Sequence, residues 1–115
     1  MDNPSTFTDD RGTIRDLLVG DDYSVTFITF NPESVRGNHY HKATSQMDLI
    51  LKGELLYSQD GNERIVKEGE LIYIPEGVKH AYKAVEYSEM VSICKGVRIG
   101  TNYEKDTFKL VEPLL

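Results

Sequence analysis

Short runs of alternating polar and apolar residues dominate the chain, and most of them end at turn-forming residues. Residues 24–30 (SVTFITF) alternate hydroxyl-bearing and bulky apolar side chains, which is typical of a strand with one buried face. Residues 47–58 (MDLILKGELLYS) indicate two strands separated at Gly53. Asp60-Gly61 predicts a hairpin turn, because a tight primed turn requires positive φ, which glycine adopts without strain.

The remaining runs complete an all-β pattern. Further strands are expected over residues 63–69, 70–75, 80–87 and 90–99, and residues 103–115 look like a last edge strand. Residues 13–20 (TIRDLLVG) are the best helix candidate, but they fit a short strand equally well. Eight or nine short strands in 115 residues predict an antiparallel jelly-roll β-barrel, with a single domain spanning residues 1–115.

Composition and charge narrow the class of protein. Hydrophobic residues make up 39% and charged residues 28%, as in an ordinary globular domain. The net charge of −6 argues against nucleic-acid and anionic-membrane partners, which bind basic surfaces. The N-terminus lacks the features of a signal peptide, and no apolar run approaches the roughly 18 residues of a membrane helix. We therefore expect a cytoplasmic protein.

Cys94 is the single cysteine, so an internal disulfide is impossible, which fits a reducing compartment. It lies in the apolar-leaning stretch MVSIC. We expect a buried structural thiol rather than a nucleophile.

The histidines form the clearest chemical pattern. His39 and His41 are separated by one residue, so on a strand they share a face and Tyr40 lies on the other. Two imidazoles on one strand face are a typical half-site for a transition metal. His80 follows the turn PEGVK, and these three are all the histidines in the chain.

The spacing of these residues resembles both motifs of the cupin superfamily, over about residues 32–84. The first motif places two histidines, an acidic residue and a glycine at positions occupied here by His39, His41, Gln46 and Gly53. The second motif places two glycines, a proline and a histidine at positions occupied here by Gly69, Pro75, Gly77 and His80. The resemblance implies a cupin-type jelly roll.

The resemblance also implies that His39, His41, His80 and Gln46 converge inside the barrel mouth. In many cupins this set binds a divalent ion of zinc, iron, manganese, nickel or copper. Here Gln46 replaces the motif glutamate, and an amide oxygen brings no negative charge, so we expect weaker metal binding. Ala84 and Glu33 also depart from the motifs, at positions that affect turns and packing. Use of the same residues without a metal stays open.

A second resemblance points to sugar chemistry. Asp10-Arg11-Gly12 and residues 36–40 (RGNHY) are similar to segments of dTDP-4-dehydrorhamnose 3,5-epimerases, and residues 36–46 are similar to cupin-type nucleotide-sugar 3,4-ketoisomerases. Those families generally work without a metal. The resemblance implies that the histidines act as general bases beside a ketone, and that Arg11 and Arg36 contact nucleotide phosphates or the sugar.

Residue chemistry agrees with that interpretation. Histidine has a pKa suited to proton abstraction near neutral pH, and arginine suits a diphosphate. Gln46 could hold a sugar hydroxyl or keto oxygen. For the acid, Tyr82 is the first candidate because it lies two residues beyond His80, and Asp48, two beyond Gln46, is the second.

We therefore expect a small-molecule-binding cupin with a divalent metal in the barrel, acting on a carbohydrate or nucleotide sugar as an epimerase or isomerase. One alternative is a metal-dependent dioxygenase or related oxidoreductase. Another is a non-catalytic module that binds a sugar or small acid, and a third is a barrel whose histidines are only satisfied polar residues. The apolar segments MDLIL and ELIYI suggest a face covered by a second copy, hence a homodimer.

Overall fold

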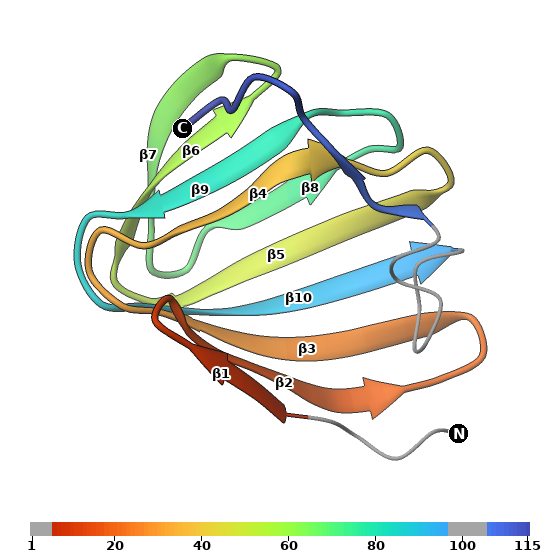
Figure 1. Ribbon diagram of the computed structural model, residues 1–115. Coiled ribbons are helices and arrows are strands. Elements are labelled where there is room, and N and C mark those ends of the chain that lie inside the picture. Colours follow the sequence, from red (N-terminus) through yellow and green to blue (C-terminus); the bar gives the residue numbers. More distant parts are fainter. Residues whose placement is uncertain (1–5, 97–105) are drawn as a thin grey trace.

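The computed structural model describes residues 6–96 and 106–115, which contain eleven strands and no α-helix (Figure 1). The first six are β1 (Thr6–Asp9), β2 (Gly12–Val19), β3 (Tyr23–Phe30), β4 (Val35–Tyr40), β5 (Thr44–Lys52) and β6 (Glu54–Gln59). The others are β7 (Asn62–Lys67), β8 (Leu71–Ile74), β9 (His80–Ala84), β10 (Ser88–Gly96) and β11 (Phe108–Lys109). No helix in these residues is long and apolar enough to cross a membrane.

The strands form two antiparallel sheets that face each other. One sheet has the order β1-β2-β3-β10-β5-β8, and the other has the order β11-β4-β9-β6-β7. The predicted all-β jelly-roll fold is confirmed. The expected eight or nine strands were too few, because β1 is too short to show alternation and β4 (VRGNHY) has no run of alternating residues. The ambiguous segment 13–20 is mostly strand β2. Residues 103–105 of the expected edge strand lie outside the described residues, and the strand itself is only β11.

The predicted turns lie where the sequence placed them. The β6–β7 hairpin turns through Asp60 and Gly61, whose φ angles of 52° and 92° are both positive, as a type I′ turn requires. Gly53, with a φ of 92°, separates β5 from β6.

The interior is apolar at one end and polar at the other. Along β5 the inward-facing residues run from Ile50 through Asp48 and Gln46 to Thr44, and all are buried. The apolar cluster gathers around Ile50 and includes Phe30, Leu55, Val66, Ile72 and Met90. Cys94 is buried, as predicted, and forms no disulfide within the described residues. The polar end of the interior, near the β4–β5 turn, is where the histidines lie.

The outer face of the six-stranded sheet is apolar as well, although one face of an antiparallel sheet is commonly polar. Outward-facing residues of β3, β10, β5 and β8 align in two cross-strand rows. The first row is Val25, Ile93, Met47 and Tyr73, and the second is Phe27, Val91, Leu49 and Leu71. We call these eight residues the outer apolar face.

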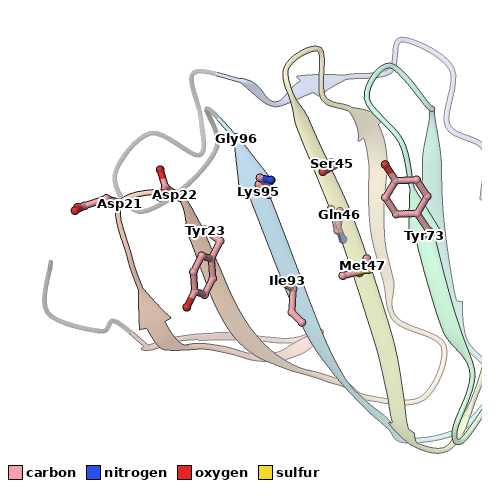
Figure 2. Close-up of a pocket in the computed structure, with 10 residues that line it drawn as sticks. All are labelled: Asp21, Asp22, Tyr23, Ser45, Gln46, Met47, Tyr73, Ile93, Lys95 and Gly96. Atoms are coloured by element: carbon pink, nitrogen blue, oxygen red, sulfur yellow. The ribbon is translucent and has the colours of Figure 1, made fainter.

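A shallow pocket of about 800 Å³ extends over part of this face (Figure 2). Tyr23 and Tyr73 stand on its two sides, with Met47 and Ile93 between them. The full lining is Asp21, Asp22, Tyr23, Ser45, Gln46, Met47, Tyr73, Ile93, Lys95 and Gly96. The three histidines are absent from this lining, and Gln46 is the one residue that it shares with the interior site.

We propose that a second copy of the chain covers the outer apolar face. The outward residues of β10 run Glu89, Val91, Ile93, Lys95, an acid and a base flanking two apolar residues. If two β10 strands cross antiparallel about a two-fold axis, Lys95 of each copy lies against Glu89 of the other. This charge complementarity favours a second copy over an unrelated partner.

Val91→Glu should convert a dimer to a monomer, because it buries a charge without a partner in the interface. Light scattering after gel filtration at micromolar concentration measures the mass. Ile65→Glu is the matched control, since Ile65 is 44% exposed on β7 of the other sheet.

Charge reversal tests the predicted orientation. Lys95→Glu should weaken the dimer, and the double variant Glu89→Lys/Lys95→Glu should restore it. A monomeric mass for the unaltered chain would contradict the proposal, and failure of the double variant to recover would contradict the antiparallel crossing.

Candidate metal centre

A β-bulge in β4 sets the direction of the first two histidines. Gly37 pairs with Ala81 and His39 pairs with His80, so Asn38 is an extra residue on β4. Gly37 and Asn38 have positive φ angles of 94° and 56°. A Cβ on Gly37 would lie 2.9 Å from the carbonyl oxygen of His80, so only glycine permits this close approach of the strands.

The three histidines meet in the polar end of the interior. Their ring centroids are 4.8 Å apart for His39 and His41, 4.6 Å for His39 and His80, and 5.3 Å for His41 and His80. One ring nitrogen from each lies within 4.8 Å of the others. His41 and His80 are 2% and 1% exposed, whereas His39 is the more accessible ring.

Backbone carbonyls fix the orientation of two of these rings. His41 Nδ1 lies 2.7 Å from the carbonyl oxygen of Asp106, and His80 Nδ1 lies 3.1 Å from that of Val78. A carbonyl oxygen only accepts, so in both neutral rings Nδ1 carries the proton and Nε2 carries the lone pair. This tautomer is the one a metal ligand needs.

Asp106 also organises the turn that follows the histidine strand. Its carboxylate accepts hydrogen bonds from Lys42 N at 2.9 Å, Ala43 N at 2.9 Å and Thr44 Oγ1 at 2.7 Å. Burial raises the pKa of the Asp106 carboxyl, but these hydrogen bonds outweigh it and hold the pKa below its usual value. Sequence analysis missed Asp106, because a lone aspartate far along the chain carries no motif.

Gln46 and Asp48 form a buried pair on β5. Gln46 Nε2 lies 2.9 and 3.0 Å from the two carboxylate oxygens of Asp48. The carboxylate only accepts, so the amide nitrogen must face it and Oε1 must face away. Gln46 is 8% exposed, and among the described residues its Oε1 has no hydrogen-bond donor. An acceptor is therefore held ready for an incoming ligand or metal.

Tyr82 completes this buried group from β9. Its hydroxyl donates to Asp48 Oδ2 at 2.6 Å, and its ring packs 4.9 Å from Tyr57 and 6.1 Å from Phe30. Burial, followed by the negative charge of Asp48, raises the pKa of Tyr82 well above its usual value. Tyr82 therefore stays protonated and directs its proton to Asp48. Its role as the acid stays a prediction, and so does the role of Asp48 as the second candidate.

The two predicted phosphate contacts lie at the opposite end of β4 from the histidines. Arg11, on the β1–β2 turn, is paired with Asp9 at 2.6 Å. Arg36 is 7% exposed, donates through Nη2 to the carbonyl oxygen of Thr29 at 3.3 Å, and lies 5.5 Å from the ring centroid of Phe30. Burial and the charge of Arg11 lower the pKa of Arg36. The two arginines are thus close to each other, and their phosphate role stays a prediction.

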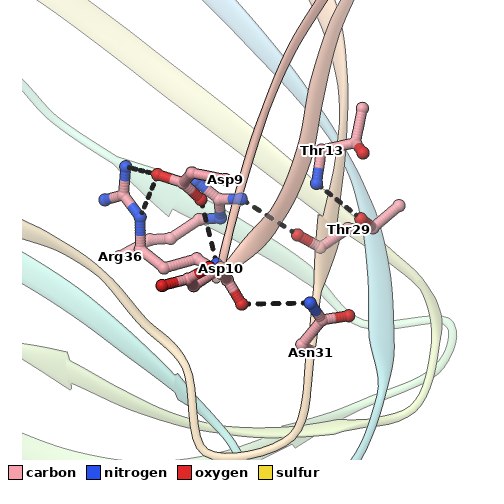
Figure 3. Close-up of polar contacts among 7 residues, drawn as sticks. Asp9, Asp10, Thr13, Thr29, Asn31 and Arg36 are labelled. Carbon is pink, nitrogen blue, oxygen red and sulfur yellow. Dashed lines mark hydrogen bonds and ion pairs between the residues drawn. The ribbon is translucent and has the colours of Figure 1, made fainter.

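Near Arg36, polar contacts join the β1–β2 turn and β2 to β3 and the residue that follows it (Figure 3). Asn31 Nδ2 donates to the carbonyl oxygen of Asp10 at 3.0 Å, and Thr13 N donates to Thr29 Oγ1 at 2.8 Å. The Asp10-Arg11-Gly12 segment thus has a structural role, because it attaches the β1–β2 turn to the end of β3.

The donor set fits a divalent transition metal. The three ring nitrogens lie within 4.8 Å of one another, so small side-chain movements would allow them to share one ion at zinc–imidazole bond lengths of about 2.0–2.1 Å. His39, His41 and His80 supply three nitrogens, and Gln46 Oε1 is an additional oxygen donor on the interior side of β5. This set suits zinc, iron or copper, and manganese with more oxygen ligands.

A family model described as "Cupin domain" matches residues 26–94. The chain belongs to the cupin family. No curated protein sequence matches this cupin, whereas many solved structures do. The matched span contains the predicted motif core of residues 32–84.

Solved structures of several different proteins are similar to the fold of this cupin. CapF, a capsular polysaccharide assembling protein of Staphylococcus aureus, is 22% identical with a TM-score of 0.78 over 96% of this chain and 33% of CapF. KdgF from Halomonas sp. is 16% identical with a TM-score of 0.74 over 83% of this chain and 86% of KdgF.

Oxalate decarboxylase of Bacillus subtilis, described with Mn(II) centres, is 22% identical with a TM-score of 0.76 over 94% of this chain and 30% of that protein. This cupin therefore spans about a third of the length of CapF and of the decarboxylase.

Tyr82→Phe should lower the free energy of unfolding by about 1–3 kcal/mol, because Asp48 loses a buried donor. Tyr57→Phe is the matched control, since the Tyr57 hydroxyl donates to the partly exposed Gln59 at 3.0 Å, and it should cost about 0.5–1.5 kcal/mol. Urea unfolding measures both. Equal losses of unfolding free energy in the two variants would show that the Tyr82 hydrogen bond to buried Asp48 contributes no more than the Tyr57 hydrogen bond.

The pH dependence gives an independent readout of the same contact. Above the usual tyrosine pKa of 10.0 the unfolded chain releases the Tyr82 proton while the folded chain keeps it. Folding stability should therefore fall as the pH rises above that value, and Tyr82→Phe should make the fall shallower.

Proposed function

We propose that this cupin binds one divalent transition-metal ion through His39, His41 and His80, with Gln46 Oε1 as a fourth ligand. The observation that carries the proposal is the convergence of three imidazole nitrogens within 4.8 Å, with two rings oriented by backbone carbonyls. When bound, such an ion would act as a Lewis acid that polarises a carbonyl or hydroxyl oxygen.

The charge of the interior supports a cation at this position. The three imidazoles and the Gln46 amide are neutral, so the groups that would contact a divalent ion do not compensate its charge. Asp48 lies directly behind Gln46 and hydrogen-bonds its amide nitrogen. The carboxylate that other cupins place among the ligands thus lies here two positions further along β5, at Asp48, and the Gln46 amide connects it to the site.

The ligand we propose is a small carbohydrate-like molecule with a carbonyl or hydroxyl oxygen. With metal bound, the ion would polarise that oxygen, whereas without metal His39, the more accessible of the three rings, could take a proton beside the carbonyl. In either case Gln46 Oε1 faces the interior as an acceptor. The structurally similar CapF is a capsular polysaccharide assembling protein, which agrees with this class of ligand. The reaction we propose is an epimerisation or isomerisation.

An oxidoreductase is the second candidate, favoured by one observation. Three histidines with access for further ligands can also hold iron or manganese, and a structurally similar oxalate decarboxylase is described with Mn(II) centres. Oxygen consumption with reduced metal and candidate acids would distinguish it from the isomerase.

Metal binding is the first test. Untagged protein, purified without chelator or nickel resin, should contain about one divalent transition-metal ion per chain by elemental analysis. His41→Ala should remove most of that metal. A chain without metal that also takes up none on titration would contradict the proposal and leave the histidines as metal-free bases.

Gln46→Glu tests the displaced carboxylate. The new carboxylate should tighten metal binding about tenfold, which is about 1.4 kcal/mol. Without metal it should destabilise the fold by about 1–3 kcal/mol, because it faces Asp48 with no proton to donate. Asn62→Asp, the same amide-to-carboxylate change at an exposed residue of β7, is the matched control and should change neither quantity. Unchanged metal affinity in Gln46→Glu would show that position 46 is not a ligand.

Proton abstraction can be tested without knowing the product. Keto-sugar derivatives, free and nucleotide-linked, are incubated with metal-loaded and with metal-free protein in D₂O, and NMR follows deuterium at the carbon beside the carbonyl. Incorporation should require His39 and be lost in His39→Ala. Binding without incorporation would identify a binding module, and unchanged nucleotide-sugar affinity in Arg36→Met would reject the phosphate contact.

A further inference from the structure

The C-terminal strap, residues 106–115, lies along the strand that carries two of the three histidines (Figure 1, dark blue). Its short strand β11 pairs with β4 in register, Phe108 with Tyr40 and Lys109 with His39. The Phe108 and Tyr40 rings stack with centroids 5.3 Å apart, and Lys42 Nζ lies 4.4 Å from the Phe108 centroid. The strap is therefore joined to both ends of the histidine pair.

The far end of the strap is held by the bulge residue itself. Asn38 Oδ1 accepts from Leu114 N at 2.7 Å and from Leu115 N at 3.2 Å, and Asn38 Nδ2 donates to the carbonyl oxygen of Leu115 at 3.2 Å. Leu110 N donates to the carbonyl oxygen of Asn38 at 2.9 Å. The residue that turns His39 inward is thus fixed from outside by the strap.

The near end of the strap contacts His41 directly. The carbonyl oxygen of Asp106 accepts from His41 Nδ1, and the carboxylate holds the backbone of Lys42 and Ala43. With the strap detached, His41 would lose the acceptor that fixes its tautomer and ring angle, and the turn after it would lose its cap.

We propose that the C-terminal strap is a positioning element of the metal site, so that strap attachment and metal binding are coupled, with Asp106 as the main positioning residue. This rests on the metal binding proposed above. Outer contacts that orient metal-ligating histidines typically contribute 10–100-fold to affinity. Coupling of two binding events is reciprocal, so metal should hold the strap in place by the same factor.

The test measures zinc affinity in the full chain by competition with a chromogenic chelator. Asp106→Ala should weaken zinc binding about tenfold or more, and Asp106→Asn, which keeps one acceptor oxygen, should lie between it and the unaltered chain. Val111→Ala is the matched control, because Val111 lies in the same strap and is 99% exposed. Its zinc affinity should not change.

Amide hydrogen exchange provides a readout that a merely structural role of Asp106 would not change. Zinc should slow exchange at the Ala43 and Leu114 amides, which bond Asp106 and Asn38 at the two ends of the strap. The slowing should match the affinity factor. The Val66 amide in β7, distant from the strap in the sheet order, is the internal control.

Each result has one interpretation. If the unaltered chain binds zinc and the zinc affinity of Asp106→Ala is within twofold of its affinity, the coupling is overturned and the metal proposal stays intact. The same holds if zinc does not slow exchange of the Leu114 amide. A chain that takes up no metal would overturn both. If Asp106→Ala does not fold, Asn38→Gly replaces it, since glycine accepts the φ of 56° and removes only the side-chain bonds to the strap.

Discussion

The bulge at Asn38 is the constraint on which the rest of the site depends. Strict alternation along β4 would place Arg36 and His39 on opposite faces of the sheet. With one extra residue between Gly37 and His39, Arg36 pairs with buried Tyr82 and His39 pairs with buried His80, so both face the interior. The bulge needs positive φ at two successive residues, which glycine and asparagine tolerate best.

The negative charge near the histidines lies on Asp48 and not on a proposed metal ligand. A glutamate in the ligand shell binds metal through charge, whereas Gln46 offers only an oriented dipole, and the charge resides on Asp48 behind it. Asp48 is fully buried and is satisfied by neutral donors from Gln46 and Tyr82. A buried carboxylate held in this way is costly unless it serves a nearby positive charge. The arrangement is thus easier to explain with a cation at the histidines than without one.

Sequence alone could predict the parts of this molecule that depend on local rules. Asp60-Gly61 specified its hairpin through backbone conformation, and the resemblance to the cupin motifs implied the convergence of His39, His41 and His80. Contacts between distant segments carried no such signal. Asp106 meets the turn after His41 from more than sixty residues away, and Arg11 is paired with Asp9 rather than left available, which a short motif cannot reveal.

Stability and chemistry are divided along the length of the barrel. Around Ile50 the interior is packed with large apolar side chains, whereas the half that holds the histidines also contains Gln46, Asp48 and Ser92. Polar interiors contribute little hydrophobic stabilisation, so the apolar end must support the fold while the polar end stays able to accept a ligand. The polar end is instead held by specific hydrogen bonds, from Asp106 and Asn38 outside and from Asp48 inside. Bonds of this kind constrain geometry more than they stabilise the chain, and a site that must orient three rings toward one point requires that constraint.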